Sequence, residues 1–306
     1  MTSWRARTLN ASVRMLIRRS NWGSDEQSVA RRARRLFGST PFYQWLRTRG
    51  VHLRQETGSV RGEWLEADEA ADGVILYIHG GGYVSCSAAT HRPITAALAR
   101  LTRHRVFSLD YRLAPEHRYP AALDDAVAAY QWLLEGGTPA KLISLAGDSA
   151  GGGLVLGTLL RARQMKLPLP AAAVCFSPWT DLAGTGESAH FNDGRCVMFR
   201  PSNLPEFAEA YLGQASPLDS YASPVFADLK GLPPILLQVG STELLLDDSR
   251  RVHDKIQEAG GESRLEIYED VFHCWQMMDG FVPEAGAALR QAAEFIREHI
   301  QRLDAE

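Results

Sequence analysis

The stretch Leu142–Gly151 reads LISLAGDSAG, and it decides the fold. Its first half is a short apolar run that is typical of a buried strand, and its second half is the pentapeptide Gly147-Asp148-Ser149-Ala150-Gly151. A helical pattern opened by glycines begins at Ser149 and continues to Met165. So tight a turn between strand and helix must strain the backbone of Ser149, and the flanking glycines leave room for a neighbouring strand and helix. We therefore expect the Ser149 hydroxyl at the carboxyl edge of a sheet.

Strand and helix patterns alternate along most of the chain, which predicts an α/β fold with a mostly parallel sheet and helices on both faces. A hairpin signal, Thr57-Gly58-Ser59, predicts antiparallel strands at one edge, over Val51–Glu56 and Val60–Glu66. The other predicted strands are Val74–His79, Arg105–Asp110, Leu142–Gly147, Ala172–Ser177, Ile235–Gly240 and Leu265–Asp270. The predicted helices are Arg92–Arg103, Ala121–Glu135, Ser149–Met165, Asp247–Ala259 and Glu284–Gln301.

The alternation stops between Thr180 and Lys230, where the chain has several prolines and glycines and one helical pattern around Pro205–Leu212. We expect this insertion and residues 1–48 to form a helical cap over the carboxyl edge of the sheet. The predicted organisation is an N-terminal part of the cap over residues 1–48 and a main domain over residues 49–306, with the cap insertion at about residues 180–230. Ligands bind at this edge in doubly wound folds, so the cap would shape a pocket.

Composition excludes several classes of protein. The 306 residues are 45% hydrophobic and 23% charged, as in globular proteins, and the apolar runs are far shorter than the ~18 residues of an integral membrane span. Residues 1–50 hold eleven arginines and only two acidic residues, Asp25 and Glu26, so this segment could bind nucleic acid or anionic lipid. Its apolar residues share one helical face, which favours a packed amphipathic helix and no nucleic-acid partner; they are Leu9, Val13, Leu16 and Ile17.

The cysteines and the N-terminus indicate a cytoplasmic protein. The four cysteines are too far apart for a metal-binding motif, and no paired histidines stand at ligand spacing, so we expect free thiols and no metal. They are Cys86, Cys175, Cys196 and Cys274. Met15, Leu16 and Ile17 lie between arginines, and the apolar core of a signal peptide is missing. A mitochondrial presequence, which is also rich in arginine and poor in acids, is the alternative.

A second glycine-rich loop, His79-Gly80-Gly81-Gly82-Tyr83, directly follows a predicted strand. Successive glycines let backbone N–H groups point at one spot, and a tetrahedral acyl intermediate needs such donors around its negative oxygen. The predicted oxyanion hole consists of the N–H groups of Gly81, Gly82 and Ala150, which follows Ser149. Both loops leave the same sheet edge, which favours a nucleophilic role for Ser149 over a purely structural turn. We expect His79 to brace its own loop.

A nucleophilic serine needs a histidine base, which follows it in the chain in α/β folds with this turn. His273 lies in the loop after the last predicted strand, on the edge that carries Ser149. The other downstream histidines lie in the insertion or on polar helix faces; they are His190, His253 and His299. His273 is therefore the predicted base.

The base needs an orienting acid, which comes between the serine and the histidine in the chain. Glu243 lies in the loop after the predicted strand Ile235–Gly240. Asp247 and Asp248 stand at the start of the next helix, where acids already cap the helix and meet its dipole. We predict Glu243 as the acid, with Asp247 as the alternative.

Four segments resemble, in residues and in order, the hormone-sensitive-lipase-like family of α/β-hydrolases. They are His79–Tyr83, Asp110–Glu116, Gly147–Gly151 and the pair Glu243 and His273. The resemblance implies an eight-stranded α/β-hydrolase sheet, a helical cap and carboxylesterase activity without a cofactor. It also implies that Asp110–Glu116 braces the loop beneath the active site. The family's usual acid is an aspartate in Asp-Pro-Leu, whereas this chain has Glu243-Leu244-Leu245.

The predicted function is a serine carboxylesterase that hydrolyses short- to medium-acyl esters or lactones through an acyl-enzyme. One alternative is a small-molecule receptor of the same fold without activity, against which His273 speaks, and another is an amidase or deacetylase with the same triad. Four aromatic residues of the cap are expected mainly to pack its helices, with one or two of them lining the pocket; they are Trp179, Phe191, Phe199 and Phe207. The last strand would leave an open edge at Leu265–Tyr268, which predicts a homodimer.

Overall fold

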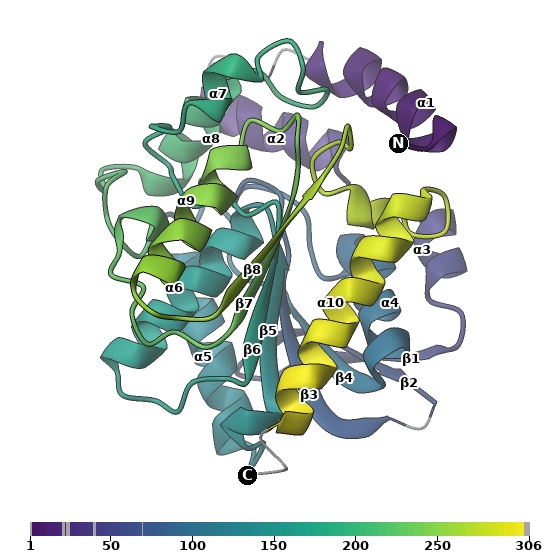
Figure 1. The fold of residues 1–306 in the computed structure, drawn as a ribbon, viewed down its shortest axis with the longest axis vertical. Helices are drawn as coiled ribbons and strands as arrows, with labels where there is room; N and C mark the ends of the chain where they lie inside the picture. The colour runs from purple at the N-terminus through teal and green to yellow at the C-terminus, as the bar shows by residue number, and fades with distance from the viewer. Residues whose placement is uncertain (1, 20–21, 23–24, 39–40, 69, 303–306) are drawn as a thin grey trace.

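The strands expected from the short apolar runs are all present and join in one sheet (Figure 1). The computed structural model describes residues 2–19, 22, 25–38, 41–68 and 70–302. Within these residues the sheet has eight strands in the order β1-β2-β4-β3-β5-β6-β7-β8. Their bounds are β1 Val51–Thr57, β2 Arg61–Ala67, β3 Ala71–Ile78, β4 His104–Leu109, β5 Ile143–Asp148, β6 Ala172–Phe176, β7 Ile235–Gly240 and β8 Ser263–Tyr268.

The sheet is mostly parallel, as predicted. All strands from β3 to β8 run parallel to their neighbours, whereas β2 pairs antiparallel with both β1 and β4. The hairpin prediction is confirmed, because β1 and β2 pair from Val51 opposite Ala67 to Thr57 opposite Arg61. The two edges of the sheet are β1 and β8.

Helices cover both faces of the sheet (Figure 1). Helices α4 and α10 pack on one face, and α5, α6 and α9 pack on the other. Short 3-10 turns lie at Ala89–His91, Ala140–Leu142, Pro224–Phe226 and Trp275–Met278. The helices are α1 Trp4–Val13, the π-helical turn η1 Arg14–Arg18, α2 Glu26–Leu36, α3 Pro41–Arg47, α4 Arg92–Thr102, α5 Ala121–Glu135, α6 Ala150–Gln164, α7 Ser188–Phe191, α8 Asn203–Leu212, α9 Leu246–Glu258 and α10 Pro283–Arg302.

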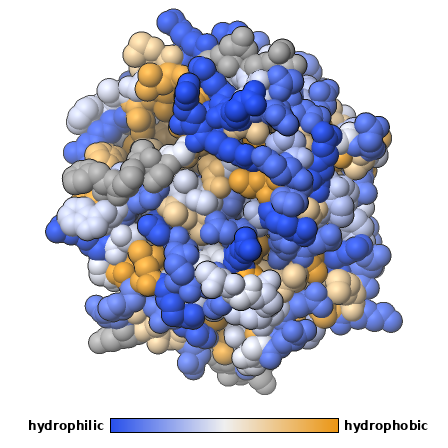
Figure 2. Space-filling model, turned by 180° about the vertical axis from the view of Figure 1, so that it is seen from behind, coloured by the Kyte–Doolittle hydropathy of each residue, from blue (hydrophilic) through white to orange (hydrophobic). Residues whose placement is uncertain are grey.

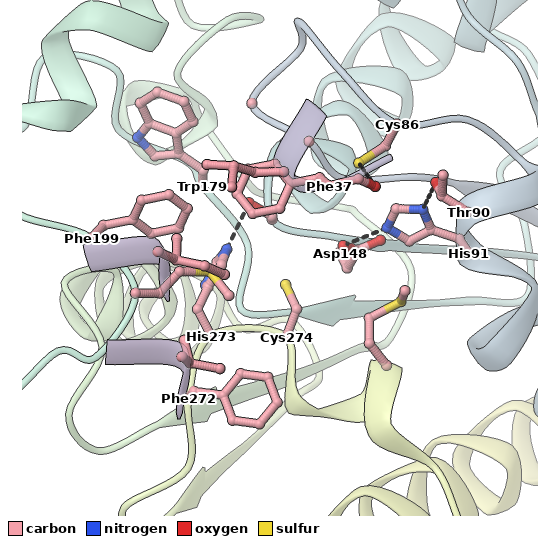
Figure 3. A pocket seen from close by; sticks show the side chains of 18 of the residues that line it. Phe37, Cys86, Thr90, His91, Asp148, Trp179, Phe199, Phe272, His273 and Cys274 are labelled. Atoms are coloured by element: carbon pink, nitrogen blue, oxygen red, sulfur yellow. Dashed lines mark hydrogen bonds and ion pairs between the residues drawn. The ribbon is translucent and has the colours of Figure 1, made fainter. Parts of the chain in front are cut away.

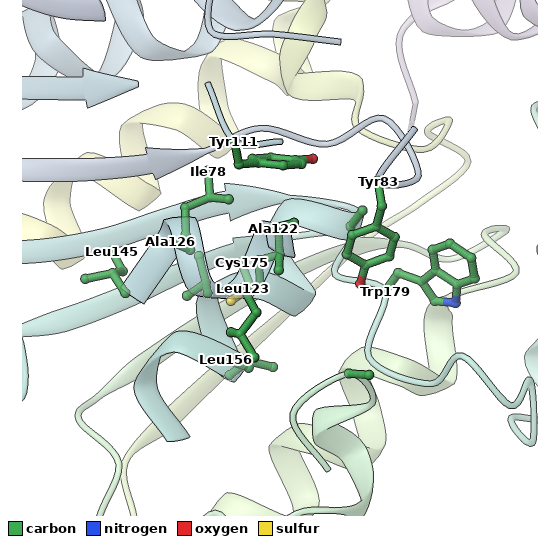
Figure 4. Packing of buried hydrophobic residues seen from close by; sticks show 14 of the residues in the cluster. Ile78, Tyr83, Tyr111, Ala122, Leu123, Ala126, Leu145, Leu156, Cys175 and Trp179 are labelled. Carbon is green, nitrogen blue, oxygen red and sulfur yellow. The ribbon is translucent and has the colours of Figure 1, made fainter. Parts of the chain in front are cut away.

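The core between the sheet and helices α5 and α6 combines large and small side chains (Figure 4). Ile78 and Leu145 from adjacent strands belong to the same buried cluster as Leu123 and Leu156 from the two helices. Burying each such side chain contributes about 1.5–3 kcal/mol. Ala126, also fully buried, adds little volume and lets α5 lie close to the strands. This packing holds β3 and β5 in place, and therefore positions the loops that begin at their carboxyl ends.

The N-terminal helices and the insertion meet at the carboxyl edge of the sheet (Figure 1). α1, α2, α7 and α8 lie at this end of the molecule, α2 packs against α8, and α3 lies on the flank against α4. The residues from Thr180 to Lys230 contain α7 and α8 and no strand, as expected. Aromatic rings join the two segments, because Trp22 contacts both Phe199 and Phe207 with ring centroids 6.1 and 5.1 Å apart.

The expectation of one packed apolar face at the N-terminus is wrong for Leu16. Leu9, Val13 and Ile17 pack against buried residues, whereas the side chain of Leu16 is 65% exposed. The α-helix changes to the π-helical turn η1 at Arg14. A π-helix has more residues per turn than the 3.6 of an α-helix, so each residue rotates less about the helix axis. The side chains after Arg14 therefore leave the register that α-helical spacing predicts.

The described residues contain no helix that is both long and apolar enough to cross a bilayer. All four cysteines are free thiols, as the spacing predicted.

Candidate active site

Ser149 lies in the turn between β5 and α6, and its backbone has φ 52° and ψ −123°. This is a strained conformation for a residue with a side chain. The turn is possible because of its glycines: a Cβ atom on Gly151 would lie 2.0 Å from the carbonyl oxygen of Ile78, and one on Gly147 would lie 2.6 Å from that of Gly151. The strain and the close approaches expected from the pentapeptide are therefore both present.

The structure brings together the three residues predicted as a triad, although they are far apart in the sequence. His273 Nε2 lies 2.8 Å from Ser149 Oγ, and His273 Nδ1 lies 2.5 Å from Glu243 Oε2. The imidazole is 6% exposed and the carboxylate of Glu243 is buried. Each residue comes from a loop that leaves the carboxyl end of β5, β7 or β8. A proton on Ser149 Oγ can therefore pass to an imidazole whose opposite nitrogen faces a carboxylate.

Glu243 is held by contacts that the sequence did not reveal. Its Oε1 accepts hydrogen bonds from Ser177 Oγ at 2.7 Å and from the Gly240 N–H at 2.6 Å. Asn192, from the insertion, donates through Nδ2 to the Glu243 carbonyl oxygen at 2.8 Å. The only sequence signal for Ser177 was a polar residue at the end of a buried strand, and Asn192 gave no signal because its contact depends on the tertiary fold.

The alternative acids have other partners. Asp247 accepts from the Ser188 N–H at 2.8 Å, and Asp248 accepts from the N–H groups of Thr180 and Asp181 at 2.6 and 2.9 Å. Both carboxylates therefore tie the insertion to the start of α9. Burial, together with the nearby Asp181, raises the pKa of Asp248 to about 8 against the hydrogen bonds it accepts.

The other downstream histidines also lie in different surroundings. His190 is exposed in α7, and His253 Nδ1 lies 2.8 Å from Ser263 Oγ. The expectation that His299 lies on a polar helix face is wrong, because it is buried. Its Nδ1 lies beside the Phe295 carbonyl oxygen, one turn earlier in α10, and its Nε2 lies beside the carboxylate of Glu262, the residue before β8.

The loop His79–Tyr83 turns sharply beside Ser149. Gly81 and Gly82 have φ of 115° and 62°, which favour glycine. Within the described residues, neither of their N–H groups has a hydrogen-bond partner, and both glycines line the same pocket as Ser149. Ala150, the third predicted donor, is fully buried at the start of α6. The helix start leaves its N–H outside the helical hydrogen bonds.

Asp148 is the main residue of this site whose role the sequence analysis missed. Its buried carboxylate accepts hydrogen bonds from Tyr77 Oη at 2.6 Å and the Gly80 N–H at 2.9 Å, and it lies 3.2 Å from His91 Nε2 (Figure 3). Burial alone would raise its pKa, but the facing His91 and these hydrogen bonds hold the pKa at about 2. Asp148 therefore joins the turn of Ser149 to the glycine loop. Its place inside the pentapeptide was the available signal.

His79 and Tyr111 brace the glycine loop from beneath. The rings stack with centroids 4.2 Å apart, and Tyr111 Oη donates to the His79 carbonyl oxygen at 2.9 Å. His79 Nδ1 lies 2.7 Å from the Gly80 carbonyl oxygen, and burial followed by the nearby His91 lowers the pKa of His79 to about 3. Further along, Arg112 pairs with Asp125. These contacts place the segment from Asp110 beneath the loop, as the resemblance implied.

The pocket over Ser149 is largely apolar (Figure 3). Of the four aromatic residues expected mainly to pack the cap, three line the pocket, where one or two were expected. Trp179, Phe199 and Phe207 line the pocket, and Phe191 is about half exposed. Phe199 also packs edge-on against the His273 ring, with centroids 5.6 Å apart. The N-terminal segment contributes Val13, Ile17, Leu36 and Phe37 to the lining.

The family model described as the alpha/beta hydrolase fold matches residues 75–277. The chain belongs to this α/β-hydrolase family. An acetyl-hydrolase of Streptomyces hygroscopicus is 41% identical over 240 residues, which cover 78% of this chain and 80% of that protein. An esterase of Acinetobacter venetianus is 39% identical over 262 residues, which cover 85% of this hydrolase and 84% of the relative.

Solved structures agree with these relatives. The crystal structure of an esterase from the bacterial hormone-sensitive lipase family matches this α/β-hydrolase with a TM-score of 0.90 at 39% identity, and the match covers 98% of this chain and 99% of that one. The resemblance seen in the motifs is thus confirmed. Together these relatives show that this α/β-hydrolase is a carboxylic ester hydrolase.

Proposed function

We propose that this esterase is a serine carboxylesterase in which Ser149 is the nucleophile, His273 is the base and Glu243 orients His273. The observation that carries the proposal is the hydrogen-bonded series from Ser149 Oγ through both nitrogens of His273 to Glu243 Oε2, at 2.8 and 2.5 Å. Ser149 Oγ attacks the ester carbonyl carbon while His273 Nε2 takes the hydroxyl proton. Glu243 stabilises the imidazolium that forms.

The negative oxygen of the tetrahedral intermediate would be held by the N–H groups of Gly81, Gly82 and Ala150. Support comes from the N–H groups of the two glycines, which have no hydrogen-bond partner in the part of the chain that the structure describes. Both glycines also line the pocket that holds Ser149. The intermediate collapses when His273 returns the proton to the alcohol oxygen and the C–O bond breaks. Water, deprotonated by His273, then attacks the carbonyl carbon of the acyl-enzyme and forms a second tetrahedral intermediate. When this intermediate collapses, its bond to Ser149 Oγ breaks, His273 returns the proton to Ser149 Oγ, and the carboxylic acid leaves.

The substrates would be neutral short- to medium-acyl esters or lactones. The pocket lining supports this, because aromatic and aliphatic side chains surround Ser149 and would favour an uncharged apolar group. We also propose that residues 1–48 and about 180–230 act together as the cap. Trp22 and Phe207 join these segments by ring contact, and both segments line the pocket.

Ser149→Ala tests the nucleophile. The purified variant should keep the wild-type melting behaviour and lose measurable ester turnover, since the remaining catalysis is only ~10³–10⁴ over water. A serine-directed organophosphate should add its mass to the peptide that contains Ser149. Turnover close to wild type, or labelling at another serine, would assign the nucleophile elsewhere.

A panel of chromogenic esters from acetyl to palmitoyl, run beside matching anilides, separates the alternatives. A serine carboxylesterase should cleave the shorter esters faster than the longer esters and the anilides. Faster cleavage of anilides would indicate an amidase, and binding without any turnover would indicate a receptor.

We further propose a homodimer through β8. This strand lies at the open edge of the sheet, and Ile267 on it is more than one-third exposed. Pairing with a second copy would satisfy the free backbone groups of the edge. Analytical ultracentrifugation at micromolar concentration should show a dimer that Ile267→Lys weakens; a monomer across this range would exclude the pairing.

A further inference from the structure

Helix α1 and the turn η1 present two different faces. Leu9 and Val13 pack inward, and Val13 and Ile17 line the pocket over Ser149. The outer face carries the three most exposed large apolar side chains among the described residues. They are Trp4, Leu16 and Met15, with exposed fractions of 71%, 65% and 61%. The same short segment thus forms part of the pocket wall and a hydrophobic outer surface.

The exposed residues form a stripe along the helix. Trp4 and Met15 are eleven positions apart, close to three turns of 3.6 residues, so they lie on nearly the same face. Thr8 and Ala11 lie between them on this face and are also exposed. Leu16 joins the stripe because η1 shifts it outward from the packed face. We call these five residues the outer stripe.

Arginines flank the outer stripe. Arg7 and Arg14 are two turns apart and lie on one side of it, and Arg5 lies on the other. Arg14 donates to the carbonyl oxygens of Gly194 and Arg195, which leaves its charge unneutralised.

Few carboxylates balance this charge. Residues 2–19 contain five arginines and no acidic residue. Of these arginines, Arg18 alone pairs with a carboxylate within the described residues, that of Asp193.

Positive charge prevails along the N-terminal segment, where residues 1–38 hold nine arginines and two acidic residues. α2 lies at the same end of the molecule as α1 and exposes Arg31 and Arg35 (Figure 1). Three carboxylates lie near α1 and only partly offset these arginines. Glu269 and Asp270 are exposed on the loop that Thr2 and Asn10 contact, and Glu284 accepts hydrogen bonds from Ser3. Hydrophobic and strongly hydrophilic side chains lie side by side in the upper part of the molecule (Figure 2).

We propose that the outer stripe and its arginines dock on the surface of an anionic phospholipid bilayer. A helix with tryptophan and aliphatic residues on one face and arginines along its borders suits the plane where acyl chains meet charged headgroups. A nucleic acid would use the arginines, but it offers no apolar layer for Trp4, Met15 and Leu16. The lipid surface therefore accounts for both features of the stripe.

Docking in this way would bring the pocket close to the lipid. Val13 and Ile17 lie on the opposite side of the helix from the outer stripe, and a helix with its side chains is about 10–12 Å across. Esters dissolved in the bilayer would then lie near the pocket that holds Ser149. The docking itself does not depend on the proposed triad, and Ser149→Ala should bind vesicles as the wild type does.

Vesicle sedimentation with the full-length protein tests the docking. The protein should pellet with vesicles of phosphatidylcholine and phosphatidylglycerol but not with phosphatidylcholine alone, and raising the salt from ~0.1 to ~0.5 M should release it. Failure to pellet with the anionic vesicles at low salt would overturn the proposal. Pelleting with both kinds of vesicle, or binding to duplex DNA in place of vesicles, would also overturn it.

Two sets of substitutions locate the contact. Met15→Ser with Leu16→Ser should weaken binding to the anionic vesicles by about tenfold or more, because two apolar side chains are lost. Arg5→Gln with Arg7→Gln should weaken it by a similar factor. Equal binding by wild type and both variants would show that this face is not the docking surface.

Matched controls lie elsewhere on the surface. Met165→Ser removes an exposed apolar side chain at the end of α6, and Arg290→Gln with Arg297→Gln removes two exposed charges from α10. Both controls should bind as the wild type does. Circular dichroism spectra and turnover of a soluble ester should be unchanged in every variant, which would establish that the fold is intact. If the variant with Met15→Ser and Leu16→Ser unfolds, the variant with Arg5→Gln and Arg7→Gln still tests the docking.

Discussion

The sheet edge around Ser149 and the segments above it are built in opposite ways. At the sheet edge, buried hydrogen bonds fix each functional group: Glu243 accepts two of them, and Asp148 joins Gly80 to Tyr77. Above the edge, contacts between aromatic rings such as Trp22 and Phe207 predominate. Hydrogen bonds specify direction, whereas apolar contacts tolerate repacking. We therefore propose that the residues at the sheet edge carry out the chemistry and that the segments above this edge select the ester.

The largest effect is expected when the acid of the proposed triad changes. Glu243→Gln should lower turnover by about 10⁴, because the imidazole then adopts the wrong tautomer, as in a comparable triad. Glu243→Asp should keep part of the activity, since the carboxylate remains but is one methylene shorter. Steady-state kinetics with a short-acyl ester measure both.

Asp247→Asn is the matched control for Glu243→Gln. Asp247 accepts from the Ser188 N–H, so its loss should lower the melting temperature and leave turnover within about tenfold of the wild type. A collapse of turnover in Asp247→Asn, with Glu243→Gln active, would transfer the orienting role to Asp247.

Asp148→Asn tests whether the glycine loop needs its brace. The amide can still accept a hydrogen bond from the Gly80 N–H but loses the charge beside His91. We therefore expect turnover to fall by about 10² through misplacement of the proposed oxyanion hole. The fall should appear in kcat with KM nearly unchanged, because the apolar pocket remains. An unchanged kcat would limit Asp148 to a role in stability.

Acid unfolding of the same variant sharpens this test. Because the pKa of Asp148 is lowered to about 2 in the folded protein, its carboxylate stabilises the fold above about pH 4 and loses this effect as the pH falls through 2. The stability gap between wild type and Asp148→Asn should therefore narrow between pH 5 and pH 2. A constant gap would show that the charge does not contribute.

The same contrast explains what the sequence could predict. Ser149, Glu243 and His273 follow strand ends, and parallel strands bring such ends to one edge, so their meeting could be inferred from order alone. Ser177 and Asn192 act through contacts set by the packing of distant segments, which no local pattern encodes. Leu16 was misplaced because helical periodicity assumes 3.6 residues per turn, and η1 departs from it.

A moderate change in specificity is expected from Phe207→Leu. Phe207 lies against Gly82, because a Cβ atom added to Gly82 would be 2.5 Å from the Phe207 ring. Leucine in place of Phe207 would therefore open the pocket beside the proposed oxyanion hole. The ratio of kcat/KM for an ester with a bulkier acyl group to kcat/KM for the acetyl ester should rise by roughly tenfold. This is the effect of one or two methylene groups in an apolar pocket. Phe191→Leu, at an exposed position outside the pocket lining, should leave the ratio unchanged.

The smallest effect concerns Arg34, which connects the two regions. Its guanidinium donates to the carbonyl oxygens of Val84 and Ala114 and pairs with Glu116, so α2 is fastened to the segment beneath the glycine loop. The ion pair is partly exposed and contributes little, but the two carbonyl contacts fix the helix. Arg34→Gln should lower the melting temperature by roughly 2–4 °C, which corresponds to about 1 kcal/mol for a chain of this size. It should leave turnover of a short-acyl ester unchanged.

Arg35→Gln, next to Arg34 and exposed, provides the control for this substitution. Differential scanning calorimetry of both variants decides whether the regions are coupled through Arg34. If Arg34→Gln and Arg35→Gln melt together with the wild type, the aromatic contacts alone hold the upper segments in place. If Arg34→Gln instead lowers turnover as well as the melting temperature, the geometry of the sheet edge depends on the segments above it. The segments above the edge would then contribute to the chemistry as well as to the choice of ester.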